Sequence, residues 1–152
     1  MNKSAGTFEM LLVEDNPGDV RLVLEALRDG ELPCHLSVAK DGTEATDFLW
    51  RRGTHRHAPR PDLILLDLNL PGKNGREVLQ ELKADPELCS IPVAVFTSSA
   101  APSDLDKAYQ LHANCYIRKP SDLDEYMSVV RSIEHFWTSI ATLPHKRFSG
   151  PH

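Results

Sequence analysis

The chain has few cysteines and no cysteine pairs at metal-binding spacing. Its three cysteines, Cys34, Cys89 and Cys115, are odd in number and far apart, and no CxxC pair is present. This usage argues against a disulfide framework and against a zinc site built on cysteine pairs. It predicts reduced thiols, so we expect the protein to work in the cytoplasm.

Long apolar runs and an excess of basic residues are also missing. No run approaches the roughly 20 apolar residues that cross a bilayer, and residues 1–7 are too short and polar for a signal peptide. The net charge of −5 argues against a dedicated nucleic-acid binder. Neither a Walker motif nor a GxGxxG stretch is present, so no backbone phosphate cradle is visible. We therefore expect neither a membrane nor DNA as a partner.

What the chain does contain is a regular alternation of short apolar segments and amphipathic segments. Five apolar segments predict strands, and each is followed by helical spacing behind a capping residue. The predicted strands are Met10–Val13, Cys34–Ala39, Leu63–Leu66, Pro92–Phe96 and Cys115–Arg118. Because parallel neighbours need crossover connections, this alternation predicts an α/β fold with a doubly wound, five-stranded parallel sheet and five helices. We expect one domain over residues 8–143, with flexible termini at 1–7 and 144–152.

Acidic side chains stand at the ends of two predicted strands. Glu14 and Asp15 follow the first strand, and Asp67 ends the apolar run of the third. Ligands of doubly wound sheets bind beyond the carboxyl ends of the strands, so these three acids should meet in one crevice. Their mutual repulsion calls for a hard divalent cation, and we expect Mg²⁺ (or Mn²⁺) on Glu14, Asp15, Asp67 and the backbone carbonyl of Asn69. The plain alternative is that Asp67 only caps the loop that follows it.

Two further polar residues complete a chemical set at the same edge. Thr97 ends the fourth predicted strand and Lys119 follows the fifth. Such a set suits phosphoryl transfer, in which the Asp67 carboxylate attacks phosphorus and becomes an acyl phosphate. The metal and the Lys119 ammonium would neutralise the phosphoryl oxygens, and the Thr97 hydroxyl would donate a hydrogen bond to one of them. Each residue alone is ordinary, so the prediction depends on the set.

Four motifs together resemble the receiver domain of two-component response regulators, over roughly residues 8–135. They are Glu14-Asp15-Asn16, Asp67-Leu68-Asn69-Leu70-Pro71-Gly72, Thr97-Ser98 and Lys119-Pro120. The resemblance implies that Asp67 accepts a phosphoryl group from the phosphohistidine of a sensor histidine kinase. It is consistent with the flavodoxin-like strand order 2-1-3-4-5. It also implies a signalling switch that catalyses only its own phosphorylation and dephosphorylation, and not an enzyme with a separate substrate.

The same resemblance assigns roles to residues near the phosphoacceptor. It implies that Thr97 and Tyr116 form a switch pair, with the hydroxyl drawn to the phosphate and the aromatic ring turned inward, which changes the surface of helix four, strand five and helix five. It implies a cis peptide bond between Lys119 and Pro120. Asn69 and Ser99 occupy positions that tune the lifetime of the acyl phosphate in this family.

The last predicted helix is longer than one sheet needs. Its apolar residues keep helical spacing from Leu123 to Ile140. One interpretation is that the overhang folds back on its own domain. The other is a homodimer surface of helix four, strand five and helix five, with Tyr126, Val130, Phe136 and Trp137 at the interface.

A narrower resemblance concerns the kinase partner. The run 121–126, the Phe136-Trp137 pair and the basic loop 51–61 look like the small stand-alone regulators paired with bacterial and cyanobacterial phytochromes. This resemblance implies a phytochrome-type histidine kinase. The His55-Arg56-His57 run in that loop is interpreted as a solvated basic segment and not as a metal site, because the arginine disfavours a cation there.

Two other classes of protein share parts of this pattern. An aspartyl-phosphate phosphatase also uses an aspartate nucleophile and magnesium, but it needs an acid two residues further on, where this chain has Asn69. A flavodoxin-like cofactor binder needs a Ser, Thr or Gly loop after the first strand. Glu14 and Asp15 would repel a phosphate there.

Overall fold

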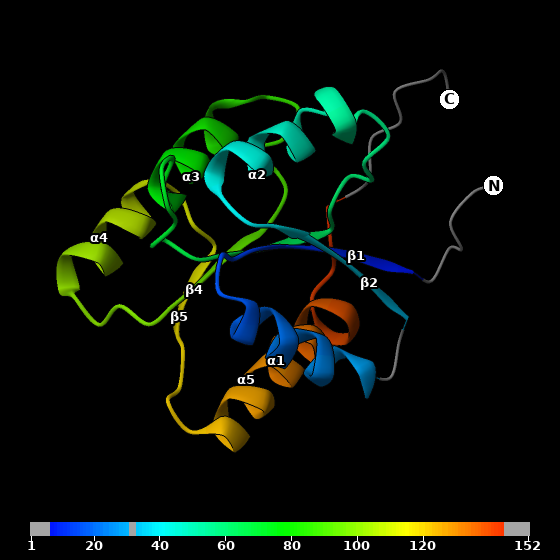
Figure 1. The fold of residues 1–152 in the computed structure, drawn as a ribbon, viewed down its shortest axis with the longest axis vertical. Helices are drawn as coiled ribbons and strands as arrows, with labels where there is room; N and C mark the ends of the chain where they lie inside the picture. The colour runs from blue at the N-terminus through cyan, green and yellow to red at the C-terminus, as the bar shows by residue number, and fades with distance from the viewer. Residues whose placement is uncertain (1–6, 31–32, 145–152) are drawn as a thin grey trace.

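The computed structural model describes residues 7–30 and 33–144 (Figure 1). The predicted flexible termini fall almost entirely outside these ranges. Strands and helices alternate along the described chain. They are β1 (Phe8–Val13), α1 (Pro17–Arg28), β2 (Cys34–Ala39), α2 (Gly42–Leu49), β3 (Leu63–Leu66), α3 (Gly75–Ala84), β4 (Val93–Thr97), α4 (Pro102–Gln110), β5 (Cys115–Arg118) and α5 (Leu123–His135), with short 3₁₀ and π segments at Gly53–His55 and Phe136–Ile140.

The strands form one parallel sheet in the order β2-β1-β3-β4-β5, which confirms the predicted fold and strand order. All residues of β1, β3 and β4 are buried, as expected for central strands covered on both faces. The edge strands β2 and β5 are more exposed. In the described ranges, no helix is both long enough and apolar enough to cross a membrane.

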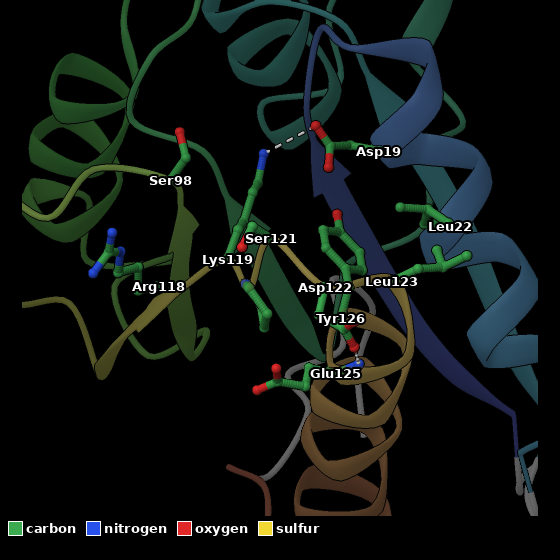
Figure 2. Close-up of a pocket in the computed structure, with 11 residues that line it drawn as sticks. Asp19, Leu22, Ser98, Arg118, Lys119, Ser121, Asp122, Leu123, Glu125 and Tyr126 are labelled. Atoms are coloured by element: carbon green, nitrogen blue, oxygen red, sulfur yellow. Dashed lines mark hydrogen bonds and ion pairs between the residues drawn. The ribbon is translucent and has the colours of Figure 1, made fainter.

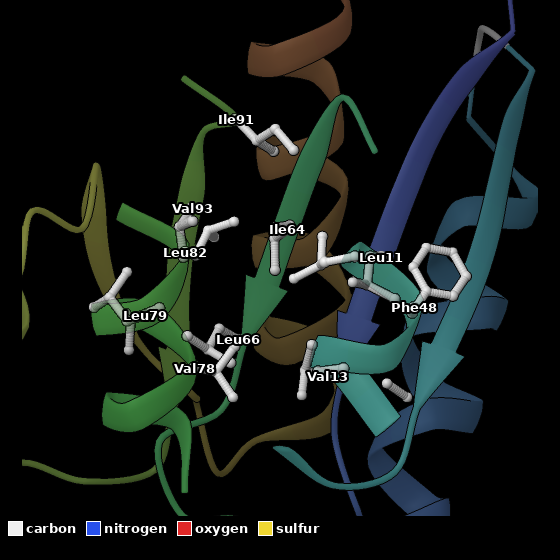
Figure 3. Close-up of a cluster of buried hydrophobic side chains, with 14 of the residues drawn as sticks. Leu11, Val13, Phe48, Ile64, Leu66, Val78, Leu79, Leu82, Ile91 and Val93 are labelled. Atoms are coloured by element: carbon white, nitrogen blue, oxygen red, sulfur yellow. The ribbon is translucent and has the colours of Figure 1, made fainter. Parts of the chain in front are cut away.

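Helices cover both faces of the sheet (Figure 1). On the face of α2, α3 and α4, the β1 side chains Leu11 and Val13 pack in a cluster with Phe48 and Val78 (Figure 3). The next residues along β1 point to the opposite face, because successive strand side chains alternate. There they join apolar residues of α1 and α5 in a second cluster.

Most helices begin behind a capping side chain, as expected. Asn16 accepts from two backbone amides of α1, and Asn74 forms a complete capping box at the start of α3. α4 begins at Pro102 without a side-chain cap, because proline suits the first helical turn. α5 is capped by Asp122, whose carboxylate accepts from the third amide of the helix.

The last helix is extended as predicted, since α5 runs directly into the π segment Phe136–Ile140. The structure corrects the predicted dimer surface for two residues. Tyr126 is 4% exposed and Val130 is fully buried, and both pack in the chain's own core. Phe136 is 45% exposed, while Trp137 packs partly against the same core. The apolar face of this helix is wide, so one side of it packs in the core of the domain and only the other side reaches the surface.

Gly75 allows α3 to begin against the backbone of the loop that carries Asp67. Its amide donates to the carbonyl of Leu68 at 3.1 Å. A Cβ built at this position would lie 2.3 Å from the carbonyl oxygen of Asp67 and 2.7 Å from the Cα of Leu68. Both contacts are with backbone that cannot move aside like a flexible side chain. Only glycine fits here without displacing the loop.

We expect Gly75→Ala to destabilise the protein by about 1–3 kcal/mol, the usual cost of overpacking a tight site. Urea unfolding should show a lower midpoint with an unchanged slope. Gln80→Ala, at an exposed position of the same helix, is the control and should change stability by less than about 0.5 kcal/mol. Equal midpoints for the two variants would contradict the close approach.

Candidate functional site

The ends of β1, β3 and β5 meet at one edge of the sheet. Backbone hydrogen bonds continue the pairing just beyond the strands. The amide of Asp67 donates to the carbonyl of Val13 at 3.1 Å, and the amide of Lys119 donates to the carbonyl of Thr97 at 2.7 Å. These bonds fix the residues that follow each strand in register, so the sequence-predicted side chains gather in one place.

Three carboxylates form a cluster at this edge. Glu14, Asp15 and Asp67 each place a carboxylate oxygen so that the three atoms lie within 4.8 Å of one another. Glu14 and Asp67 are buried, while Asp15 is exposed and keeps one side open to water. Hard carboxylate oxygens with room for water match the ligands of Mg²⁺ or Mn²⁺. The residues present therefore fit a divalent cation.

Lys119 lies among these acids with its side chain only 8% exposed. Its ammonium donates to Glu14 Oε1 at 2.6 Å and to Asp67 Oδ2 at 3.1 Å. Buried charges are tolerated when they are paired and hydrogen-bonded, and this lysine pairs with both buried carboxylates. The structure therefore brings the predicted lysine into direct contact with the predicted phosphoacceptor.

The cluster also changes the pKa values of its members. Burial raises the pKa of Glu14 to about 7, even though the Lys119 ammonium favours the charged carboxylate and lowers that pKa. Burial alone would lower the pKa of Lys119, but the facing Glu14 and Asp67 carboxylates outweigh it and raise that pKa. Lys119 consequently stays protonated at neutral pH, and Glu14 titrates close to neutrality.

Asp19 is a member of the site that sequence reasoning missed. It lies in the first turn of α1, and its Oδ2 accepts from the Lys119 ammonium at 3.3 Å. A signal was present in the sequence, because Asp19 falls in the first turn of the helix that follows Glu14 and Asp15 and starts at this edge. The lysine is thus shared among three carboxylates.

Asn69 connects Asp67 with Thr97. Its backbone amide donates to Asp67 Oδ1 at 3.1 Å, and its side-chain amide reaches Thr97 Oγ1 at 3.5 Å, the outer limit of a hydrogen bond. Thr97 is fully buried at the end of β4. The threonine hydroxyl is therefore close to the acid cluster and held only weakly.

A hydrogen-bond network joins the loop after β4 to its neighbours. The Tyr116 hydroxyl donates to the carbonyl of Ser99 at 3.0 Å, and the Ser99 hydroxyl donates to Asp104 Oδ2 at 2.5 Å. Arg76 of α3 forms an ion pair with the same Asp104. The Ser99 hydroxyl and the Arg76 guanidinium lower the pKa of Asp104. The predicted switch residue Tyr116 is thus tied to the loop that follows Thr97.

The predicted cis peptide between Lys119 and Pro120 is wrong for this structure. None of the peptide bonds in the two described ranges is cis. The trans form is favoured by about 0.5–1 kcal/mol even before proline, and here it is compatible with Lys119 reaching the acid cluster.

In the basic loop before β3, His55 lies against α2. His55 Nε2 lies 3.4 Å from Glu44 Oε2, and the imidazole ring packs against the Phe48 ring in a tilted arrangement. Among the residues that the structure describes, the acid cluster at the sheet edge is the only group of three or more His, Cys, Asp or Glu placed to hold a metal.

A cavity of about 790 Å³ opens beside Lys119, on the side of α1 and α5 (Figure 2). It lies between the first turns of these helices and the loop that joins β5 to α5. Its lining includes Asp19, Ser98, Lys119, Glu125 and Tyr126. Lys119 thus lines this cavity and also contacts the acid cluster.

Comparison with known proteins agrees with this geometry. Residues 10–131 match the response regulator receiver domain family. The response regulator Rcp1 of Synechocystis sp. is 47% identical over 135 residues, which cover 89% of this chain and 92% of that protein.

Two solved structures are similar over most of their length. The phosphorylated cyanobacterial phytochrome response regulator RcpA is 48% identical with a TM-score of 0.89, and the match covers 91% of this chain and 99% of that one. The Mn²⁺-bound form of Rcp1 is 46% identical with a TM-score of 0.87, with the same coverage of both chains. From its sequence, its strand order and its acid cluster, this chain belongs to the response regulator receiver domain family.

Proposed function

We propose that the protein is a stand-alone response regulator that accepts a phosphoryl group on Asp67 from a sensor histidine kinase. One observation carries this proposal. Asp67 is buried at the end of the central strand β3, beside two further acids and in contact with the Lys119 ammonium. A nucleophilic carboxylate next to a fixed cation is what transfer of a negatively charged phosphoryl group requires.

In this proposal an Asp67 oxygen attacks the phosphorus of a phosphohistidine. A phosphorus–oxygen bond forms, the phosphorus–nitrogen bond breaks, and the imidazole leaves with a proton. Lys119 neutralises one phosphoryl oxygen, and the Thr97 hydroxyl donates to another. Mg²⁺ (or Mn²⁺), held by Glu14, Asp15, Asp67 and the Asn69 carbonyl, would neutralise charge on the remaining oxygens. Hydrolysis of the acyl phosphate later restores Asp67.

The proposed conformational switch depends on the weak hydrogen bond between the Asn69 side chain and the Thr97 hydroxyl. A phosphoryl group would draw its hydroxyl away from the Asn69 amide, which lies at the limit of hydrogen bonding. Movement of Thr97 shifts the loop that contains Ser99, and Tyr116 is bonded to that loop. We propose that this rearrangement alters the α4–β5–α5 surface.

Similarity to RcpA and Rcp1 supports a phytochrome-type kinase as the partner, because RcpA is a phytochrome response regulator. All three cysteines are free, which is consistent with work in the reducing cytoplasm. No DNA contact is part of the proposal.

One prediction of this proposal concerns Asp67 as the phosphoryl acceptor. Incubation with acetyl phosphate and Mg²⁺ should add the mass of one phosphoryl group, in an acid-stable and base-labile linkage, because an acyl phosphate forms at Asp67. Asp67→Asn should abolish the adduct, and mass spectrometry measures it. Asp106→Asn, at an exposed position on α4, should keep it. A full adduct on Asp67→Asn would disprove the assignment.

The second prediction uses the pKa of Glu14, which burial raises to about 7. Below that pH the carboxylate holds a proton, and the proton competes with metal. The dissociation constant for Mn²⁺ should therefore rise as the pH falls from 8 to 6, by up to roughly tenfold per pH unit below 7. Calorimetric titration measures it. Glu14→Gln should bind more weakly but with a flatter pH profile; an equally steep profile would show that another group titrates.

The third prediction concerns a homodimer through α4, β5 and α5, which we propose on the exposed apolar edge of this face. Phe136 and Trp137 line an apolar cavity of about 540 Å³ between β5 and α5. Phe136→Glu should shift the sedimentation coefficient toward that of a monomer, because a charge is buried poorly in an apolar interface. Gln80→Glu on α3 is the control. A dimer that persists in Phe136→Glu would remove this face from the interface.

A further inference from the structure

Tyr126 has a buried hydroxyl without a partner. The side chain is 4% exposed, and within the described residues its hydroxyl oxygen makes no hydrogen bond. The ring is well placed, because it packs edge-on against Phe96 with 5.3 Å between centroids. A phenylalanine would make the same ring contact without burying an unsatisfied polar atom, which is costly. The hydroxyl is therefore a buried donor that this arrangement leaves unused.

The hydroxyl points toward charged groups of the site. Figure 2 shows the Tyr126 ring standing up from α5, with its oxygen directed to the space between Lys119 and Asp19. Burial raises the pKa of Tyr126, and its interaction with the facing Asp19 carboxylate raises it further. The hydroxyl therefore keeps its proton at physiological pH and faces Asp19, although no hydrogen bond of normal geometry joins the two groups.

Asp19 faces Tyr126 but is hydrogen-bonded to Lys119 in this structure. Its carboxylate accepts from Lys119 at 3.3 Å, which is the longest of the three contacts of that ammonium. Asp19 is also the most exposed of the three acids, at 22% of its side chain. When the charge around Lys119 changes, this contact is the one most readily given up.

We propose that phosphorylation of Asp67 transfers the Asp19 carboxylate from Lys119 to the Tyr126 hydroxyl. This inference rests on the proposed function. The phosphoryl group adds negative charge at Asp67 and draws the ammonium toward it. The Asp19 contact lengthens, and its carboxylate then accepts from the tyrosine. Asp19 and Tyr126 act here as positioning residues and do not touch the reacting atoms.

The exchange links α1 and α5 by a new hydrogen bond. These helices lie side by side on one face of the sheet, whereas α3 and α4 lie on the other face (Figure 1). The Arg76–Asp104 pair joins α3 to α4. Phosphorylation would therefore be sensed on the α1–α5 side as well as through Thr97 and Tyr116. The cavity lined by Asp19 and Tyr126 is the surface that changes.

Thermal unfolding of the full chain tests the exchange, with and without Mg²⁺ and beryllofluoride as a stable phosphoryl mimic. Without the mimic, Tyr126→Phe should unfold at the same temperature as the unmodified protein or higher, because it removes an unpaired hydroxyl. With the mimic, it should unfold about 2–4 °C lower, because a hydrogen bond is lost. Tyr109→Phe, exposed on α4, is the control and should show no difference between states.

A double-variant cycle identifies the partner. In the mimic-bound state, Asp19→Asn combined with Tyr126→Phe should lose less stability than the sum of the single variants, whereas without the mimic the two effects should add. The same coupling in both states would overturn the exchange. If Asp19→Asn does not fold, slowed exchange of the Tyr126 hydroxyl proton in the mimic-bound protein, seen by NMR, supports the exchange, and unchanged exchange overturns it.

The controls also separate this inference from the proposed function. If the mimic fails to raise the unfolding temperature of the unmodified protein, the acceptor function fails and the exchange fails with it. If the mimic raises that temperature but Tyr126→Phe responds alike in both states, only the exchange is wrong.

Discussion

The contact between Lys119 and the carboxylates of Glu14, Asp19 and Asp67 is the interaction on which the rest of the site depends. Removing several negative charges from water is costly unless a cation is fixed among them. The parallel sheet makes this possible because its strand ends bring acids and a lysine from distant parts of the chain to one edge. In the function proposed above, the same balance of charge would receive another anion, the phosphoryl group.

The sheet also divides the surroundings of the site into two sides. Ser99 and Asp104 belong to the loop and helix that follow β4, and they connect with α3. Tyr126 and Asp19 belong to α5 and α1, which cover the opposite face. The residues beside the acid cluster therefore belong to two separately packed layers. A change of charge at the acid cluster therefore acts on residues of both layers.

Much of this arrangement could be predicted from the sequence, because it depends on period and position. Apolar alternation predicted the strands and helices, and the position of Asp67 after a buried run predicted its place at the sheet edge. Asp19 was missed although it falls in the first turn of the helix after the acids. The pairing of Arg76 with Asp104 was missed because it depends on side-chain directions that local spacing does not give. Tyr126 and Val130 were placed on the surface, since an apolar stripe does not say which of its edges faces the core. The peptide before Pro120 was assigned from a family pattern that this structure does not follow.

The distance along the chain between the acids and their lysine has a consequence for biosynthesis. Lys119 is separated from Asp67 by 52 residues and from Glu14 by 105. A polypeptide leaves the ribosome N-terminus first, so β1 and β3 emerge well before β5. Until the lysine arrives, a nascent chain that pairs these strands holds its carboxylates together without their own counter-charge. Completion of the electrostatic balance is thus tied to the late strand β5.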